Sequence, residues 1–185
     1  MLEKNILKHS ILTSKNHRDL DKKTISKFTT GYKLMENAGK QIFKLIKSKL
    51  KKNKEIKILC GPGNNGGDGF IVAKLLKEDG FKNVSLFSLL SKEKLKGDAK
   101  KAANTCSYIF LSFSSFKTSK DDLIIDGIFG SGLKRNISGK IKKIIQKINL
   151  KKPYCIAIDI PTGINGDTGE IQGTALKSNE TVTFT

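Results

Sequence analysis

A glycine-rich stretch at residues 61–70, with the sequence GPGNNGGDGF, restricts the fold of this chain more than any other feature. It joins a short apolar run at 56–60 to an apolar pattern at 71–76 that is typical of a helix. Gly61, Gly63 and Gly66 have the G-x-G-x-x-G spacing, which lets a backbone turn tightly and present amide groups to an anion. The stretch therefore predicts a strand, a glycine loop and a helix, with a phosphate-bearing ligand at the loop.

Three spaced glycines also occur in strand-to-helix turns that bind nothing. Here Asn64, Asn65 and Asp68 add polar side chains that a simple turn does not need, which favours a ligand site. Folds that hold NAD in the usual way carry an acidic residue at the end of the second strand. The expected second strand, 83–88, ends without one. We therefore expect contact with a nucleotide or phosphate, but not that mode of holding NAD.

The rest of the chain alternates apolar runs with helical patterns, which predicts strands and helices in alternation. The runs read as continuous apolar segments, and this is typical of a parallel sheet covered on both faces. The predicted fold class is α/β, a Rossmann-like and mainly parallel sheet with helices on both faces, and residues 1–185 have the length of one domain. The expected strands are 56–60, 83–88, 108–111, 121–126, 154–158 and 181–184, and the expected helices are 14–28, a second beginning near 31, one after the glycine loop, 91–107 and one capped by Ser138.

Polar side chains follow three of the expected strands. Ligands of open parallel sheets bind beyond the carboxyl ends of the strands, so these side chains should converge in one crevice. Each has an ordinary alternative, such as a helix cap for Asp68 or a satisfied turn for Thr162. Asp126 and Asp159 end buried strands, where a carboxylate is costly unless a cation or hydrogen bonds stabilise it. The converging set is Asn64, Asn65, Asp68, Asp126, Ser131, Asp159 and Thr162.

This set offers only oxygen donors, with no histidine or cysteine. Carboxylate, amide and hydroxyl oxygens suit a group I or group II cation better than zinc or iron. Alternatively, a carboxylate in a partly dry cleft acts as a general acid or base if burial raises its pKa. A natural division gives one aspartate to the cation and the other to proton transfer. The residues alone indicate an enzyme that moves protons on a nucleotide derivative.

The charge of the chain raises nucleic acid as a competing partner. The formal net charge is +18, but the excess is almost all lysine, and the only arginines are Arg18 and Arg135. Nucleic-acid readers tend to use arginine and stacking aromatics, so we rank RNA binding second. The three cysteines, Cys60, Cys106 and Cys155, have no metal-binding spacing, which favours a reducing, cytoplasmic setting. No apolar run approaches membrane-spanning length, and we expect no membrane partner.

Four segments together resemble the NAD(P)H-hydrate epimerase family, also called the YjeF N-terminal domain: residues 34–39, 60–70, 126–135 and 159–169. Enzymes of that family interconvert the R and S epimers of NAD(P)HX, a hydrated and damaged form of NADH or NADPH. A dehydratase then acts on the product to restore the cofactor. The resemblance implies a Rossmann-like fold, NAD(P)HX as substrate and a bound potassium ion (K⁺).

The resemblance also implies roles for particular residues. Asp159 matches a substrate-contacting carboxylate and is the candidate acid/base. Asp126, Asn65 and Thr162 match potassium ligands, and Thr162 stands where the family often has serine, which offers the same oxygen. The implied substrate contacts are Asn64, Asn65, Gly66, Gly67 and Asp68, the phosphate loop Gly130, Ser131, Gly132, Leu133, Lys134, Arg135 and Asn136, and Asp159.

Two alternatives to the epimerase are a non-catalytic scaffold of the same fold, associated with nucleotides or RNA, and a nucleotide-binding regulatory domain. The intact pair of aspartates argues against a degenerate site. The sequence leaves open the choice between NADHX and NADPHX and the oligomeric state, a homodimer included. The family domain usually runs past the strand resembling 181–184, so the sequence also leaves open whether the chain is part of a longer protein fused to the dehydratase.

Overall fold

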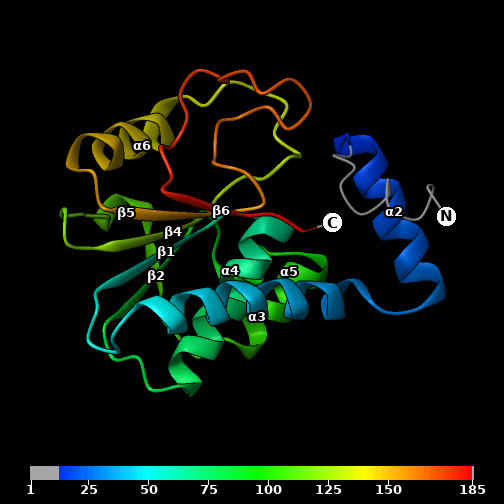
Figure 1. The fold of residues 1–185 in the computed structure, drawn as a ribbon, viewed down its shortest axis with the longest axis horizontal. Coiled ribbons are helices and arrows are strands. Elements are labelled where there is room, and N and C mark those ends of the chain that lie inside the picture. Colours follow the sequence, from blue (N-terminus) through cyan, green and yellow to red (C-terminus); the bar gives the residue numbers. More distant parts are fainter. Residues whose placement is uncertain (1–12, 185) are drawn as a thin grey trace, which may run out of the picture.

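The computed structural model describes residues 13–184, except for the side chains of His17 and Arg18, and shows a six-stranded parallel sheet with helices around it (Figure 1). The predicted fold class is confirmed. The strands are β1 (Ile56–Cys60), β2 (Val84–Ser88), β3 (Phe110–Ser112), β4 (Leu123–Gly127), β5 (Tyr154–Ile158) and β6 (Glu180–Val182). The helices are α2 (Ser14–Lys27), α3 (Gly31–Lys49), α4 (Asn64–Glu78), α5 (Gly97–Thr105) and α6 (Gly139–Lys151), with short 3₁₀ turns η2 (Lys92–Lys94) and η3 (Phe113–Ser115).

The strand order is β3-β2-β1-β4-β5-β6, so the chain builds the sheet outward from β1 in one direction and from β4 in the other. Neighbouring strands pair in parallel, and Leu59 of β1 lies beside Asp126 of β4. Where the order reverses, the connections leave in opposite directions and open a crevice beyond the carboxyl ends of the strands. The topology therefore places the crevice at the ends of β1 and β4.

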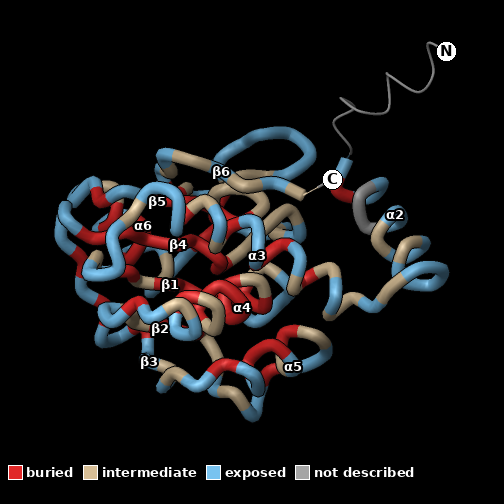
Figure 2. Tube along the Cα trace, turned by 60° about the horizontal axis from the view of Figure 1, so that its bottom comes forward, coloured by how far each residue is buried: buried red, intermediate tan, exposed pale blue. Residues whose placement is uncertain are grey.

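Two apolar clusters fill the two sides of the sheet, because residues along each strand alternate between faces. Helices α3, α4 and α5 cover one face, where Ile58 and Ile125 belong to the larger cluster. Helix α6 covers the other, where Leu59 and Ile124 pack against Ile145. Every residue of β4 is buried, and so are most residues of β1 and of the first half of α4 (Figure 2). In the part of the chain that the structure describes, every helix is too short or too polar to cross a bilayer.

The start of α4 differs from the prediction. The expected loop over 61–70 is only three residues long, and the helix begins at Asn64 instead of Ile71. Glycine and asparagine are poor helix formers, which is why this stretch reads as a loop. Close packing overrides the propensity, since a Cβ atom on Gly67 would lie 2.4 Å from the Met35 side chain and one on Gly69 would lie 2.7 Å from Cys60 Sγ. The glycines let α4 approach the sheet and the neighbouring helices.

Several smaller boundaries also move. The expected strand 108–111 is β3 at 110–112, the expected strand 181–184 is β6 at 180–182, and β4 extends one residue past Asp126. The segment 91–107 divides into η2 and α5. Ser138 does precede α6, but its side chain makes no capping hydrogen bond.

We predict that two neighbouring glycines of the motif differ sharply in their tolerance of a methyl group. A Cβ on Gly61 would lie 1.7 Å from the Ile128 carbonyl oxygen, a backbone atom that cannot move aside, whereas a Cβ on Gly63 meets nothing within 4 Å. Urea unfolding should show that Gly61→Ala lowers the free energy of unfolding by about 3 kcal/mol or more. Gly63→Ala should change it by less than about 1 kcal/mol. Equal effects would contradict the close approach of these two loops.

Candidate functional site

Asp126 and Thr162 form a buried polar contact at the centre of the sheet edge, and neither side chain has measurable exposure to solvent. The Thr162 hydroxyl lies 2.7 Å from Asp126 Oδ1, and the Thr162 amide donates to Asp126 Oδ2 at 2.8 Å. The Ile128 amide also donates to Oδ1, at 3.2 Å. These contacts connect the end of β4 to the loop that follows β5. Both residues lie where the sequence predicted them.

Burial raises the pKa of Asp126 to about 6, and the three hydrogen bonds from Thr162 and Ile128 oppose that increase. The Thr162 hydroxyl is also 3.1 Å from the Phe129 carbonyl oxygen. The Thr162 hydroxyl has a single proton, so it can donate to either Asp126 Oδ1 or the Phe129 carbonyl oxygen but not to both. A cation would stabilise such a cluster. Among the described residues, no group of three or more histidine, cysteine or acidic side chains could hold a metal ion, so a zinc-like site is not indicated there.

Asp159 follows β5 and has a positive φ of 66°, which is uncommon for a residue other than glycine. Its Oδ2 accepts a hydrogen bond of 2.7 Å from the Ser131 amide in the loop after β4. The glycine at position 130 leaves room for this carboxylate, because a Cβ there would lie 2.4 Å from Asp159 Oδ2. Among the described residues no hydrogen bond to Asp159 Oδ1 is found, and the residue is half-buried. Asp159 therefore has one carboxylate oxygen, Oδ1, that can contact a ligand.

Asn65 joins the first turn of α4 to both aspartate-bearing segments. In the amide orientation that satisfies its neighbours, its nitrogen donates to the Ile158 carbonyl at 3.1 Å and its oxygen accepts from the Gly130 amide at 3.3 Å. Ile158 immediately precedes Asp159. The predicted meeting of Asn65, Asp126 and Asp159 at one rim of the sheet is thus confirmed as geometry.

Asp68, one turn further along α4, is half-buried beside the same crevice. Burial, then the charge of Asp159 and then that of Asp21 in α2, raise the pKa of Asp68 well above its usual range. Two carboxyl groups that face one crevice are side chains of the type used in general acid and base catalysis. Asp68 and Asp159 therefore bring such groups to the site from two different elements.

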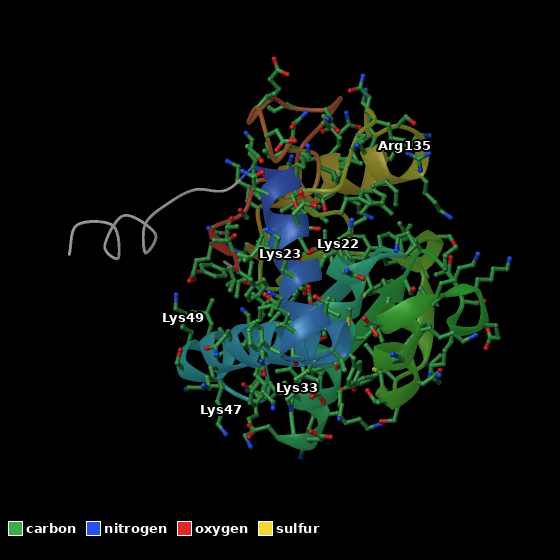
Figure 3. All side chains as sticks on the ribbon, turned by 90° about the vertical axis from the view of Figure 1, so that its right-hand side faces the viewer. Lys22, Lys23, Lys33, Lys47, Lys49 and Arg135 are labelled. Carbon is green, nitrogen blue, oxygen red and sulfur yellow. The ribbon has the colours of Figure 1, made fainter. Side chains whose placement is uncertain are left out.

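The other predicted substrate contacts stay predictions, and the structure shows their surroundings. Gly66 packs on the Gly61 carbonyl, and Gly67 packs on α3 and α5, so both glycines also serve helix packing. Leu133 packs against the cluster under α6. Lys134 and Arg135 are exposed, and Arg135 lies beside α6 (Figure 3). Of the remaining predicted contacts, Gly130 and Ser131 lie at the crevice, Asn64 is exposed as the first residue of α4, and Gly132 and Asn136 are exposed in the loop after β4.

Sequence reasoning missed Phe129, whose amide donates to the Thr162 hydroxyl at 3.0 Å. Phe129 contributes its backbone amide, so its residue type gives no indication of this contact in the sequence. A separate cavity of about 460 Å³ lies beside the crevice, at the carboxyl ends of β2 and β3, and is lined by Ser88, Lys92, Tyr108 and Phe110 among others. Asn65, Asp126, Asp159 and Thr162 do not line this cavity, so it is distinct from the crevice.

Comparisons with known proteins identify the family and agree with the fold. Residues 31–185 match the family described as YjeF-related protein N-terminus. The chain is 39% identical to an NAD(P)H-hydrate epimerase of Lentilactobacillus buchneri, covering 93% of this chain and 81% of that protein. It is 39% identical to the bifunctional NAD(P)H-hydrate repair enzyme Nnr of Coxiella burnetii, of which it spans only 35%. The crystal structure of yeast ynu0, YNL200c, has the same fold, with a TM-score of 0.77 at 24% identity over 93% of this chain and 79% of that one.

The raised pKa of Asp126 predicts a pH-dependent stability. Folding raises the pKa of this acid from about 3.9 to about 6, so its contribution is greatest below about pH 4 and is lost as the pH rises through 6. The free energy of unfolding of the wild type, relative to Asp126→Asn, should fall by about 3 kcal/mol between about pH 3 and about pH 7.5. Urea unfolding in tetramethylammonium buffers free of potassium and sodium measures this. A difference in unfolding free energy between the two proteins that stays constant, or grows with pH, would contradict the raised pKa of Asp126.

Proposed function

The chain belongs to the family of YjeF-related protein N-termini, and on that basis we propose that it is an isomerase that interconverts the R and S forms of NAD(P)HX. Relatives of similar length are named NAD(P)H-hydrate epimerases, at identities of 39% and 32% over 93% and 100% of this chain. The observation that carries the proposal is the crevice itself, where Asp159 lies beside a carboxyl group with a raised pKa.

The proposed chemistry needs proton transfer and no nucleophile. Hydration gives one ring carbon of the nicotinamide a hydroxyl group, and epimerisation breaks and remakes one bond to that carbon without net oxidation. A base must take a proton from the substrate and an acid must return one on the way to the other epimer. Asp159, held by the Ser131 amide, is suited to exchange that proton. Asp68 is suited to supply the complementary proton, because the pKa of Asp68 is raised.

We assign potassium to the oxygen cluster of Asp126 and Thr162, with Asn65 as a further ligand. The fit rests on the donor set, which is hard, contains one full charge and lacks histidine and cysteine. The carboxylate of Asp126 is buried and its hydroxyl neighbour cannot donate to both oxygens around it. A bound cation would supply positive charge close to the substrate. The residues themselves would keep the crevice walls in place.

Two further proposals concern the setting of the enzyme. Bifunctional relatives combine this unit with additional sequence, since the chain spans 30% to 35% of them. We propose that the product passes to an NAD(P)HX dehydratase, whether on a separate chain or on the same one. The cysteines Cys60, Cys106 and Cys155 are all buried free thiols, which supports a cytoplasmic location.

Epimerisation of (R)-NADHX, followed by chromatography of the S form, tests the proposal. The folded wild type with potassium should exceed the spontaneous rate and should slow when tetramethylammonium replaces potassium. Asp159→Asn retains an oxygen for the Ser131 amide and should stay folded, yet lose about 10²- to 10⁴-fold in kcat. The matched control is Asp121→Asn, which alters an exposed aspartate before β4 and should be fully active. A wild-type rate equal to the spontaneous one would defeat the proposal.

A further inference from the structure

Helix α2 crosses the same edge of the sheet as the crevice, although it precedes the matched family region, which begins at residue 31. Figure 3 looks onto this edge, and α2 runs in front of the sheet from the loops near α6 to α3. A hydrogen bond at the beginning of the helix, a charge interaction at its middle and a side-chain contact at its end define this position.

The beginning of α2 is attached to the loop after β5. The Ser14 amide donates to Asp167 Oδ1 at 2.6 Å, although the two residues are 153 positions apart. Ser14 is buried, and its hydroxyl would lie 2.8 Å from a Cβ placed on Gly166. The same Cβ position on Gly166 would lie 2.8 Å from the Ser131 side chain, and the Ser131 amide holds Asp159. Ser14 and Ser131 therefore lie beside the same glycine, which connects α2 to the proposed acid/base.

The middle and end of α2 lie over α4, α3 and α5. Asp21 is close enough for its charge to contribute to the raised pKa of Asp68, after burial and the charge of Asp159. Ile25 approaches Gly31 at the start of α3, where Asp98 of α5 also lies. The helix thus extends from the loop after β5, past the first turns of α4, to the far side of the crevice.

We propose that α2 is part of the substrate site: it covers the crevice over the bound dinucleotide, and the contact between Ser14 and Asp167 positions it there. The identity of the ligand rests on the proposed function. Leu20, Ile25 and Phe28 of this segment are 47%, 40% and 82% exposed, so α2 buries little apolar surface of its own. Elements with few buried contacts open locally at low cost. A ligand therefore enters when the Ser14 end releases, and residues 28–30 serve as the hinge.

Hydrogen exchange of the α2 amides, followed by mass spectrometry, tests whether α2 covers the crevice and does not require turnover. Asp167→Ala removes the acceptor of the Ser14 amide and should speed exchange about tenfold, because a tenfold change corresponds to the free energy that one such hydrogen bond contributes. Asp167→Asn keeps an oxygen at that position and should recover most of the protection. The matched control is Glu170→Ala in the same loop, where the Glu170 carboxylate accepts a hydrogen bond from the Thr168 hydroxyl. In this variant the α2 amides should exchange as in the wild type. An equilibrated mixture of R and S NADHX should slow exchange in the wild type.

Steady-state kinetics give the second readout. Asp167→Ala should raise KM for (R)-NADHX several-fold while kcat stays within about twofold, since the proton-transferring groups are unchanged. Exchange that Asp167→Ala leaves unaltered, or NADHX that binds in equilibrium dialysis without slowing α2 exchange, would overturn the inference. Failure of the proposed function has a different signature, namely wild-type protein that neither turns over nor binds NADHX.

Discussion

The structure depends on the burial of one carboxylate, that of Asp126, which is energetically unfavourable. Asp126 lies near the end of β4, next to the point between β1 and β4 where the strand order reverses. Asp126 lies inside a parallel sheet whose own hydrogen bonds do not satisfy it, and Thr162 satisfies it with both an amide and a hydroxyl. That contact binds the loop after β5 to the end of β4. Phe129 then meets Thr162, and Ser131 meets Asp159. The buried charge therefore organises the loops that form the crevice.

Close backbone packing supplies the other half of the site. Gly61 and Gly66 let the first turn of α4 approach the β1 and β4 loops, which places Asn65 between Ile158 and Gly130. Asp68 then lies near Asp159. The glycines of the predicted nucleotide motif also bring side chains from three loops together. Stability and function thus rest on the same residues, and a larger residue at Gly61 would disturb both.

The sequence predicted the sheet, its parallel strands and the meeting of Asp126, Asp159 and Asn65, because carboxyl ends of parallel strands share one edge. It placed the start of α4 seven residues late, since glycine and asparagine favour loops locally and the packing against Met35 and Cys60 is tertiary. Local patterns also could not show that Leu133 packs under α6. Nor could they pair Ser14 with Asp167, which no periodicity connects.

Thermal unfolding in matched chloride salts of potassium and tetramethylammonium, at about pH 7.5 where Asp126 is charged, tests most directly whether this buried carboxylate is a cation site. Potassium should raise the Tm of the wild type and of Thr162→Ser, which keeps the oxygen, by an amount that grows with its concentration. Asp126→Asn should show no such increase. An equal potassium effect in Asp126→Asn and the wild type would contradict the central role assigned to Asp126.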